Sequence, residues 1–460
     1  MNRIQYLIKN TLIFALGTVG TKLINFLLVP LYTNVLLKSE YGTVDLAFTL
    51  GTFLVPLLIL NINEAILRFS LDKGADQNKI LSVGFASLGF MLVASGCAYP
   101  LLRLYPPIAE YAPLVLLYFI SSGTSTVFMY HLRGKEMLLR FSVGNILNTL
   151  FVAGLNIVFL TVLSLGVKGY FLAYIIANGV TAVYAFFAGN AASALGHFSI
   201  DRGLLGQMLR YSLVLIPNSF MWWVMDSSDR VMLTSMVGLS VTGMYAIAGK
   251  LPSIVSVISS VFNQAWNYSA IKEQESADSA AYHSSVFDKL FLSVVTVGSG
   301  ILLILKPFMS VYVEASYYDA WRYTPPLIVG TVILVLSTFL SSSYTVNKDS
   351  KGFLFSALSG AVVNILLNLA LIPLWGALGA AIATCVAYAT VFLYRFFDTK
   401  KYLRLRVFTL KHILLFLAFL GAAFATYLGK VGYLILGAEL LLVLSVFGYS
   451  FWKSLRKRSA

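Results

Sequence analysis

The sequence predicts an all-α polytopic membrane protein with about fourteen transmembrane helices, arranged as two parallel six-helix lobes followed by two additional helices. Three observations predict it. The 460 residues are 58% hydrophobic and only 11% charged, with a mean hydropathy of +0.82. The charges fall in short segments between long apolar runs. Related turn sequences recur about 200–210 residues apart. A chain of this size and composition is not a soluble globular protein.

Apolar stretches of about twenty residues, bounded by charged or turn residues, mark the individual spans. The first lobe, residues 1–200, contains the spans 11–37, 42–67, 80–102, 112–132, 141–164 and 169–192. The second lobe, residues 201–400, contains 208–236, 240–266, 287–310, 324–346, 353–374 and 377–397. Residues 401–460 supply two further spans, 411–429 and 432–452, and a basic tail. The connecting segments are too short to fold as a catalytic domain, so we expect no enzyme.

The placement of Lys and Arg orients the chain. If the N-terminus is cytoplasmic, the loops on that side hold 24 of the 33 basic residues and the opposite loops hold six. An even number of spans returns the C-terminus to the cytoplasm. The formal net charge of +14 is therefore explained by the concentration of basic residues in the loops on one side of the membrane. For this reason we expect no nucleic-acid partner.

Two pairs of turns indicate an internal repeat. EYGTVDLA after the first span matches VTGMYAIA after the seventh, which aligns Gly42 with Gly243. SLGVKGYFLAY before the sixth span matches LWGALGAAIAT before the twelfth, which aligns Gly166 and Gly169 with Gly376 and Gly379. Because six spans separate the copies, both halves enter the membrane in the same direction. In transporters built from such parallel repeats the substrate site lies between the halves.

Ionisable side chains inside the spans are the candidate functional residues, since each costs roughly 2.5–3.5 kcal/mol at the bilayer centre and is retained there for a reason. They gather on the first, second, seventh and eighth spans, which are equivalent pairs in the two halves. The candidates for a substrate cavity are Lys22, Asn25, Asp226, Arg230 and Lys250. The candidates for gating or coupling are Asp45, Glu64, Arg68 and Asp229.

Several of these residues have a second interpretation. Asp226 and Arg230 are spaced i,i+4 and neutralise each other if they pair within one helix. Asp229 and Arg230 are also consistent with positions close enough to the outer interface to be wetted there. Asp45 is equally consistent with a solvated helix start. By contrast, Lys22 and Lys250 have no opposite charge on their own helical faces, which favours an aqueous cavity.

The remaining polar residues predict neither a metal site nor a cofactor. The four histidines, at the predicted cytoplasmic ends of spans, do not pair at metal-ligand spacing. Coupling to a proton or sodium gradient stays open. The asparagines of the fifth and eleventh spans are typical of hydrogen bonds between membrane helices.

Four segments resemble a known family: KLINFLLVPLYTNVLLKSEYGTVDLAFT, the DR pair of the seventh span, the following GMYAIAGK, and GALGAAIAT. They are similar to the polysaccharide (O-antigen-type) flippases of the multidrug/oligosaccharidyl-lipid/polysaccharide exporter superfamily. The resemblance covers roughly residues 5–397. It implies a V-shaped cavity between two lobes, with the family's cationic cavity residues at Lys22, Arg230 and Lys250.

The resemblance also implies a function. Such flippases move undecaprenyl-pyrophosphate-linked oligosaccharide from the inner to the outer leaflet of the bacterial cytoplasmic membrane by alternating access, for surface polysaccharide synthesis. The implied partners are this lipid-linked substrate, membrane lipids and a polysaccharide polymerase complex. A lipid II flippase and a cation-coupled multidrug exporter of the same superfamily remain alternatives, and the two added helices are also found in lipid II flippases.

Overall fold

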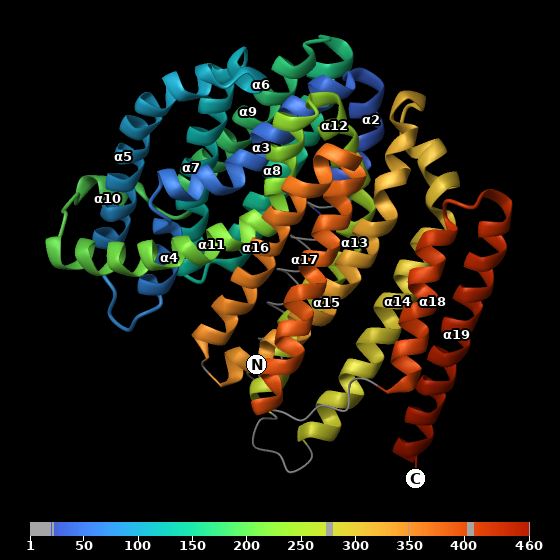
Figure 1. The fold of residues 1–460 in the computed structure, drawn as a ribbon. Helices are drawn as coiled ribbons and strands as arrows, with labels where there is room; N and C mark the ends of the chain where they lie inside the picture. Colours follow the sequence, from blue (N-terminus) through green and yellow to red (C-terminus); the bar gives the residue numbers. More distant parts are fainter. Residues whose placement is uncertain (1–19, 21–22, 273–278, 348, 403–408, 460) are drawn as a thin grey trace. The chain divides into compact units, whose positions relative to one another are not determined.

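The protein is a helical bundle, as the sequence predicts. The computed structural model describes residue 20 and residues 23–272, 279–347, 349–402 and 409–459, and every regular element in those ranges is a helix (Figure 1). Its contacts divide the chain into two compact units, Met1–Trp223 and Val224–Ala460. The boundary lies inside one long helix, α11 (Arg202–Met236). The predicted division into lobes at residues 200 and 400 stays a prediction.

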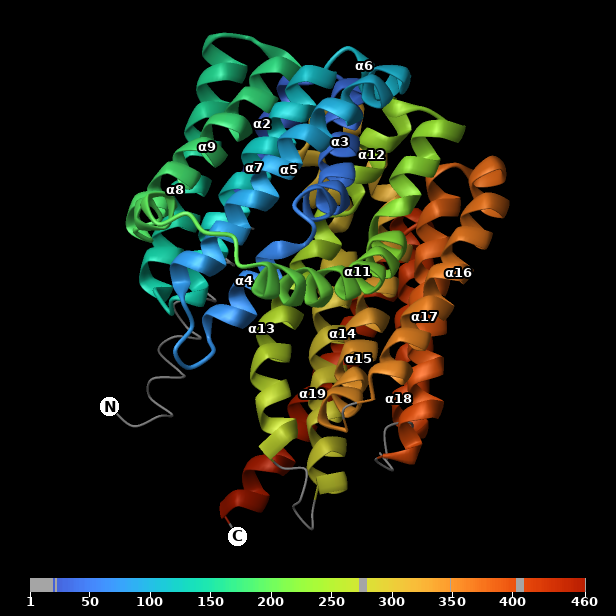
Figure 2. The same ribbon diagram turned by 90° about the vertical axis from the view of Figure 1, so that its left-hand side faces the viewer.

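The first unit combines membrane-length helices with several short helical segments. They are α2 (Val29–Val35), α3 (Lys38–Leu58), α4 (Ile62–Ser70), α5 (Gln77–Leu104), α6 (Pro106–Ala109), α7 (Ala112–Gly134), α8 (Leu138–Ile157), η1 (Val158–Val162), α9 (Gly166–Ala188), α10 (Ala192–Gly196) and the start of α11. Stacked and edge-on rings of Phe48, Tyr118 and Tyr174 pack α3 against α7 and α9. The first part of α11, before the proline at position 217, runs crosswise to α5, α7 and α9 (Figures 1 and 2).

The second unit continues from α11. Its helices are α12 (Leu239–Ala248), α13 (Lys250–Lys272), α14 (Ser279–Tyr312), η2 (Ala315–Tyr323), α15 (Thr324–Val346), α16 (Ser350–Trp375), α17 (Ala377–Asp398), η3 (Thr399–Lys401), α18 (Leu410–Ala425) and α19 (Gly429–Ser459). The helices α14, α18 and α19 lie side by side (Figure 1).

Two predicted continuous spans are instead broken helices. The span 42–67 is divided between α3 and α4, because Leu60 (φ 57°) and Asn61 (φ 52°) both adopt the left-handed conformation four residues after Pro56. The span 240–266 is divided between α12 and α13, which bend by 44° at Gly249. These two spans occupy equivalent places in the predicted repeat, so each unit contains one broken helix in the equivalent span. The break lies near the end of the span in the first unit and nearer its start in the second.

The number of spans stays partly a prediction. Within the described ranges, ten helices are long and apolar enough to cross a membrane, and an eleventh is added if α12 and α13 form one span. The first predicted span is only partly described, and α18 has just 16 residues. Helix α11, which covers the predicted span 208–236, is not among the ten. The prediction of fourteen is therefore not confirmed.

The glycine turns of the predicted repeat have matching backbone geometry. Gly166 and Gly376 both adopt a positive φ, of 54° and 57°, at the starts of α9 and α17. This is a conformation that glycine adopts at little cost. A Cβ on Gly379 would lie 2.3 Å from the backbone oxygen of Leu371, so only glycine permits α16 and α17 to approach this closely.

The last two helices are attached to α14 by polar contacts at two levels. Near one end, Asp288 pairs with Lys411 and accepts a 3.1 Å hydrogen bond from the Ser450 hydroxyl. Deeper in the unit, the Ser299 hydroxyl donates a 2.9 Å hydrogen bond to the buried carboxylate of Glu439. These contacts fix the α18–α19 hairpin to the second unit.

Candidate functional site

A buried carboxylate forms the centre of a polar cluster in the second unit. Asp229 on α11 is only 3% exposed. One of its oxygens accepts a 2.8 Å hydrogen bond from the backbone N–H of Arg230. The other accepts hydrogen bonds from the hydroxyls of Tyr245 (2.5 Å) and Thr384 (3.3 Å). Three donors from α11, α12 and α17 thus converge on one carboxylate, which compensates its removal from water. The interpretation of Asp229 as a wetted residue is wrong.

The cluster continues into α16 through two asparagines. Asn364 donates to the Thr384 hydroxyl (3.3 Å) and accepts from the hydroxyl of Ser228 (3.2 Å) and the side-chain amide of Asn368 (2.9 Å). The Oδ1 of Asn368 is buried without a hydrogen-bond partner among the residues that the structure describes. The expectation of interhelical hydrogen bonds is confirmed for Asn364, and the cluster offers several oxygen atoms around one carboxylate.

Asp226, one helical turn before Asp229, has a different environment. Its side chain is exposed, and it accepts a 3.4 Å hydrogen bond from the hydroxyl of Tyr388 on α17. The two carboxylates of α11 are therefore not equivalent: one is enclosed by the unit and the other lies at its surface.

The break between α12 and α13 has Lys250 in its backbone and the guanidinium of Arg230 beside it. Lys250 is the first residue of α13 and is partly buried. The Nη2 atom of Arg230 approaches within 3.9 Å of the position that a Cβ on Gly249 would occupy, at the residue immediately before Lys250. A guanidinium and the first turn of a helix that begins with a lysine therefore lie together. Because α12 ends at Gly249, its C-terminal dipole offsets that of the α13 N-terminus. The positive charge that favours an anion at this break therefore comes from the side chains of Arg230 and Lys250.

The candidates of the first unit are more dispersed. Lys22 lies outside the described residues, and Asn25 is exposed. Asp45 is partly buried on α3. Arg68 pairs with Asp72 at 2.5 Å on an exposed surface. Glu64 accepts a 3.3 Å hydrogen bond from the side-chain amide of Asn63 and lines a polar cavity.

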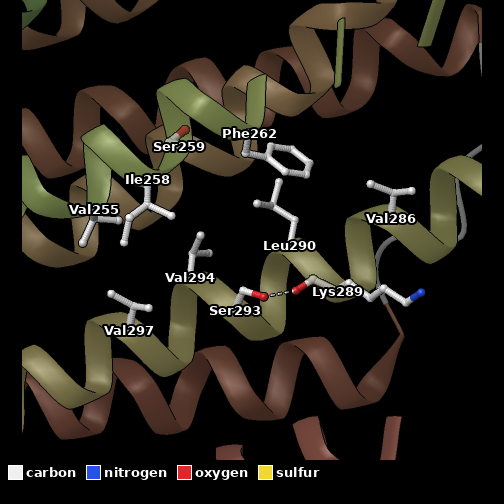
Figure 3. A pocket seen from close by; sticks show the side chains of 10 residues that line it. All are labelled: Val255, Ile258, Ser259, Phe262, Val286, Lys289, Leu290, Ser293, Val294 and Val297. Carbon is white, nitrogen blue, oxygen red and sulfur yellow. Dashed lines mark hydrogen bonds between the residues drawn. The ribbon is translucent and has the colours of Figure 1, made fainter. Parts of the chain in front are cut away.

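An apolar cavity of about 300 Å³ lies between α13 and α14 (Figure 3). Val255, Ile258 and Phe262 line one side, and the carbonyl oxygen of Lys289 accepts a 2.8 Å hydrogen bond from the Ser293 hydroxyl on the other. The ammonium group of Lys289 extends away from the cavity (Figure 3). This cavity suits an apolar chain and not a charged group.

Sequence reasoning missed the partners of Asp229, namely Tyr245 and Thr384, and the cavity around Glu64. One signal for the first was available. Asp229 lies about 80° from the polar stripe of its helix at 100° per residue, so a position facing other helices of its unit was predictable. For the second, Pro56 followed by Asn61 was a signal for a break in the helix.

Comparisons with known proteins match this architecture. The family model for polysaccharide biosynthesis proteins matches residues 7–267. No curated protein matches the sequence significantly. Among solved structures, a lipid II flippase MurJ in an inward closed conformation is 15% identical, with a TM-score of 0.69 over 96% of this chain and 99% of that one. An inward-facing multidrug resistance MATE family transporter of the MOP superfamily is also 15% identical, with a TM-score of 0.67 over 83% and 95%.

A third solved structure is a MOP superfamily transporter from Pyrococcus furiosus, 16% identical, with a TM-score of 0.58 over 85% of this chain and 95% of that one. At such identities the similarity establishes a shared fold. The fold of this chain is that of the MurJ and MATE transporters, and the chain is a multi-pass membrane protein.

Proposed function

Because the chain belongs to the polysaccharide biosynthesis protein family, we propose that it is a flippase for undecaprenyl-pyrophosphate-linked oligosaccharide. It moves this lipid from the inner to the outer leaflet of the bacterial cytoplasmic membrane by alternating access, for the assembly of surface polysaccharide such as O-antigen, capsule or exopolysaccharide. The polyprenyl tail stays in lipid while the polar head passes through the protein, and a polysaccharide polymerase complex is the expected downstream partner.

The observation that carries this proposal is the approach of the Arg230 guanidinium to the break at Gly249, the residue immediately before Lys250. A pyrophosphate carries at least two negative charges, and transfer through hydrocarbon without compensation is prohibitive. Two cations at reduced dielectric offset this cost.

Substitution of the two cations tests the proposal. Lys250→Gln and Arg230→Gln are each expected to reduce surface polysaccharide by about ten-fold or more, since each removes a charged hydrogen bond or ion pair to the substrate. Surface polysaccharide is measured on a deletion strain complemented with each variant, with protein abundance measured in parallel. Lys289→Gln is the matched control, because its ammonium points away from the nearby cavity. Normal export by both cation variants at wild-type abundance would contradict the assignment.

A second candidate function, cation-coupled export of small amphiphilic molecules, is favoured by the buried Asp229 cluster. Carboxylate, hydroxyl and amide oxygens are the ligands that hard cations prefer, and a buried carboxylate is equally suited to bind a proton. We therefore assign Asp229 to coupling with a sodium or proton gradient. This assignment fits a flippase as well as an exporter, so the substrate must be distinguished separately.

A further inference from the structure

We propose that a polar cavity of the first unit is the binding subsite for a sugar residue of the substrate. This inference rests on the proposed flippase function. The cavity has a volume of about 520 Å³ and is lined by residues of α3, α4, α7 and α11, all within the first unit. Its size lies in the range of small-molecule sites, ~300–1,000 Å³, and far exceeds what a single cation requires.

The break between α3 and α4 builds one wall of this cavity. Leu60 and Asn61 both hold a positive φ, which costs a non-glycine residue free energy and is found preferentially at functional sites. The break places Asn61, Asn63 and Glu64 on the cavity wall. On a continuous helix, at 100° per residue, these three side chains would point in different directions and would not share one wall.

A second wall of the cavity is a hydroxyl face of α7. Ser122, Thr126 and Tyr130 recur every four residues, so they lie on one side of that helix and line the same cavity. Tyr130 lies beside Glu64. Hydroxyl groups both donate and accept hydrogen bonds, as sugar hydroxyls do.

One buried acceptor in this cavity lacks a partner. Asn63 is 6% exposed, and its side-chain amide donates to Glu64. Its Oδ1 atom has no hydrogen-bond partner among the described residues. Proteins rarely leave a buried acceptor unsatisfied, so a ligand that donates an O–H to this atom fits the site.

The charge of the cavity selects against the phosphate part of the substrate. Its lining contains the carboxylate of Glu64 and, among the described residues, neither lysine nor arginine. A pyrophosphate would be repelled, whereas a neutral sugar can donate hydroxyl hydrogens to Glu64 and Asn63. The rings of Phe53 on α3 and Tyr118 on α7 also line this cavity and offer apolar surface for the C–H face of a sugar. The substrate's two polar parts are thus recognised by different units.

The experiment compares two lipids on the purified full-length protein in nanodiscs by native mass spectrometry. The probes are undecaprenyl pyrophosphate and the lipid-linked glycan fraction of the producing strain, offered as one mixture so that mass identifies what is retained. The wild type is expected to retain the glycan-bearing lipid in preference. Glu64→Gln and Tyr130→Phe are expected to lower that preference by about ten-fold, the effect of losing a hydrogen bond to a charged partner. Glu110→Gln, an exposed carboxylate of the same unit, is the control.

The outcomes separate the two proposals. Retention of neither probe above bulk phospholipid by the wild type overturns the flippase function itself. Equal retention of both probes leaves the flippase function standing and overturns the sugar subsite. An undiminished preference in both Glu64→Gln and Tyr130→Phe also overturns the subsite. Retention of the sugarless lipid by these variants verifies that they are folded.

Discussion

Asp226 and Asp229 lie three residues apart on α11, and their different surroundings give the two carboxylates different roles. Asp229 is enclosed by donors from α11, α12 and α17. Asp226 is exposed, and its carboxylate accepts a hydrogen bond from the hydroxyl of Tyr388. Binding a proton or a cation neutralises the charge of a buried carboxylate and so removes its desolvation cost. Water already solvates an exposed carboxylate, so the same binding changes its free energy much less. Coupling is therefore a property expected of Asp229.

The replacement Asp229→Asn tests this role. The amide keeps the shape and some hydrogen bonds of the side chain but removes the negative charge, so transport driven by a cation gradient should fall by about ten-fold or more, equivalent to about 1.4 kcal/mol. Transport is measured in proteoliposomes with an imposed sodium or proton gradient. Asp226→Asn, the exposed neighbour, should retain the dependence. Unchanged gradient dependence in Asp229→Asn would rule out this coupling site.

Asp349 is a residue whose protonation should affect stability. It caps α16 through the backbone N–H of Gly352 (2.9 Å) and also accepts from the Tyr402 hydroxyl (2.7 Å) and Lys401 (3.1 Å). The Gly352 N–H first, and then these two side chains, lower the pKa of Asp349 from 3.8 to about 2. A carboxylate with a lowered pKa contributes stability above its ordinary pKa and loses it as pH falls towards the lowered value.

Asp349→Asn should therefore lower the melting temperature at neutral pH and weaken its decline between pH 3.8 and about 2. Thermal unfolding of the purified protein across this pH range measures both effects. Asp72→Asn is the control, because Asp72 pairs with Arg68 on an exposed surface, where ion pairs contribute little. A decline in the Asp349 variant as steep as that of the wild type would show that Asp349 is not the titrating group.

At the scale of elements, a broken helix in each unit creates the proposed ligand contacts. In the second unit the break at Gly249 lies beside the guanidinium of Arg230. In the first unit the break directs Asn63 and Glu64 into a cavity. Non-helical backbone inside a membrane protein persists where it lines a cavity or is buried in protein, so the two breaks are consistent with binding sites.

The turn between α16 and α17 is an element that tolerates no side chain at Gly379. An added Cβ would lie 2.3 Å from the Leu371 oxygen, a backbone atom that cannot rotate away. Gly379→Ala should destabilise the protein by about 1–3 kcal/mol, the usual cost of overpacking. Gly421→Ala on α18 meets nothing within 4 Å and should be neutral or slightly stabilising. Thermal unfolding of both variants measures the difference, and equal melting temperatures would contradict this account of the turn.

At the scale of the whole molecule, the fold is compatible with both a lipid flippase and a small-molecule exporter, because the MurJ and MATE structures share it. Our proposal of a lipid-linked oligosaccharide rests on the family match and on the position of Arg230 beside the break before Lys250. The α18–α19 hairpin is fixed to α14 by Asp288, Ser299 and their partners, and this attachment does not discriminate between substrates.

Deletion of the gene distinguishes the two functions. A flippase predicts loss of surface polysaccharide and accumulation of lipid-linked glycan in the cytoplasmic leaflet, with drug susceptibility unchanged. Both are measured on the same deletion strain, with a complemented strain as the control. Increased drug susceptibility with normal surface polysaccharide would instead support the exporter.

The sequence by itself determined the membrane class, most of the spans and the glycine turns. Hydropathy is a local property of each segment, and a positive φ at Gly166 and Gly376 is required by the turn in which each residue lies. The candidate residues could also be found, because a charged residue inside an apolar run is visible without a structure.

Only the tertiary structure decided which of these residues contact one another. Helical periodicity assumes a straight helix, so it could not place residues beyond the breaks at Asn61 and Gly249. It also describes one helix at a time, and the environment of Asp229 is made by Tyr245 and Thr384 from two other helices. The burial of a charge depends on what packs around it, and that is set by contacts between segments far apart in the sequence.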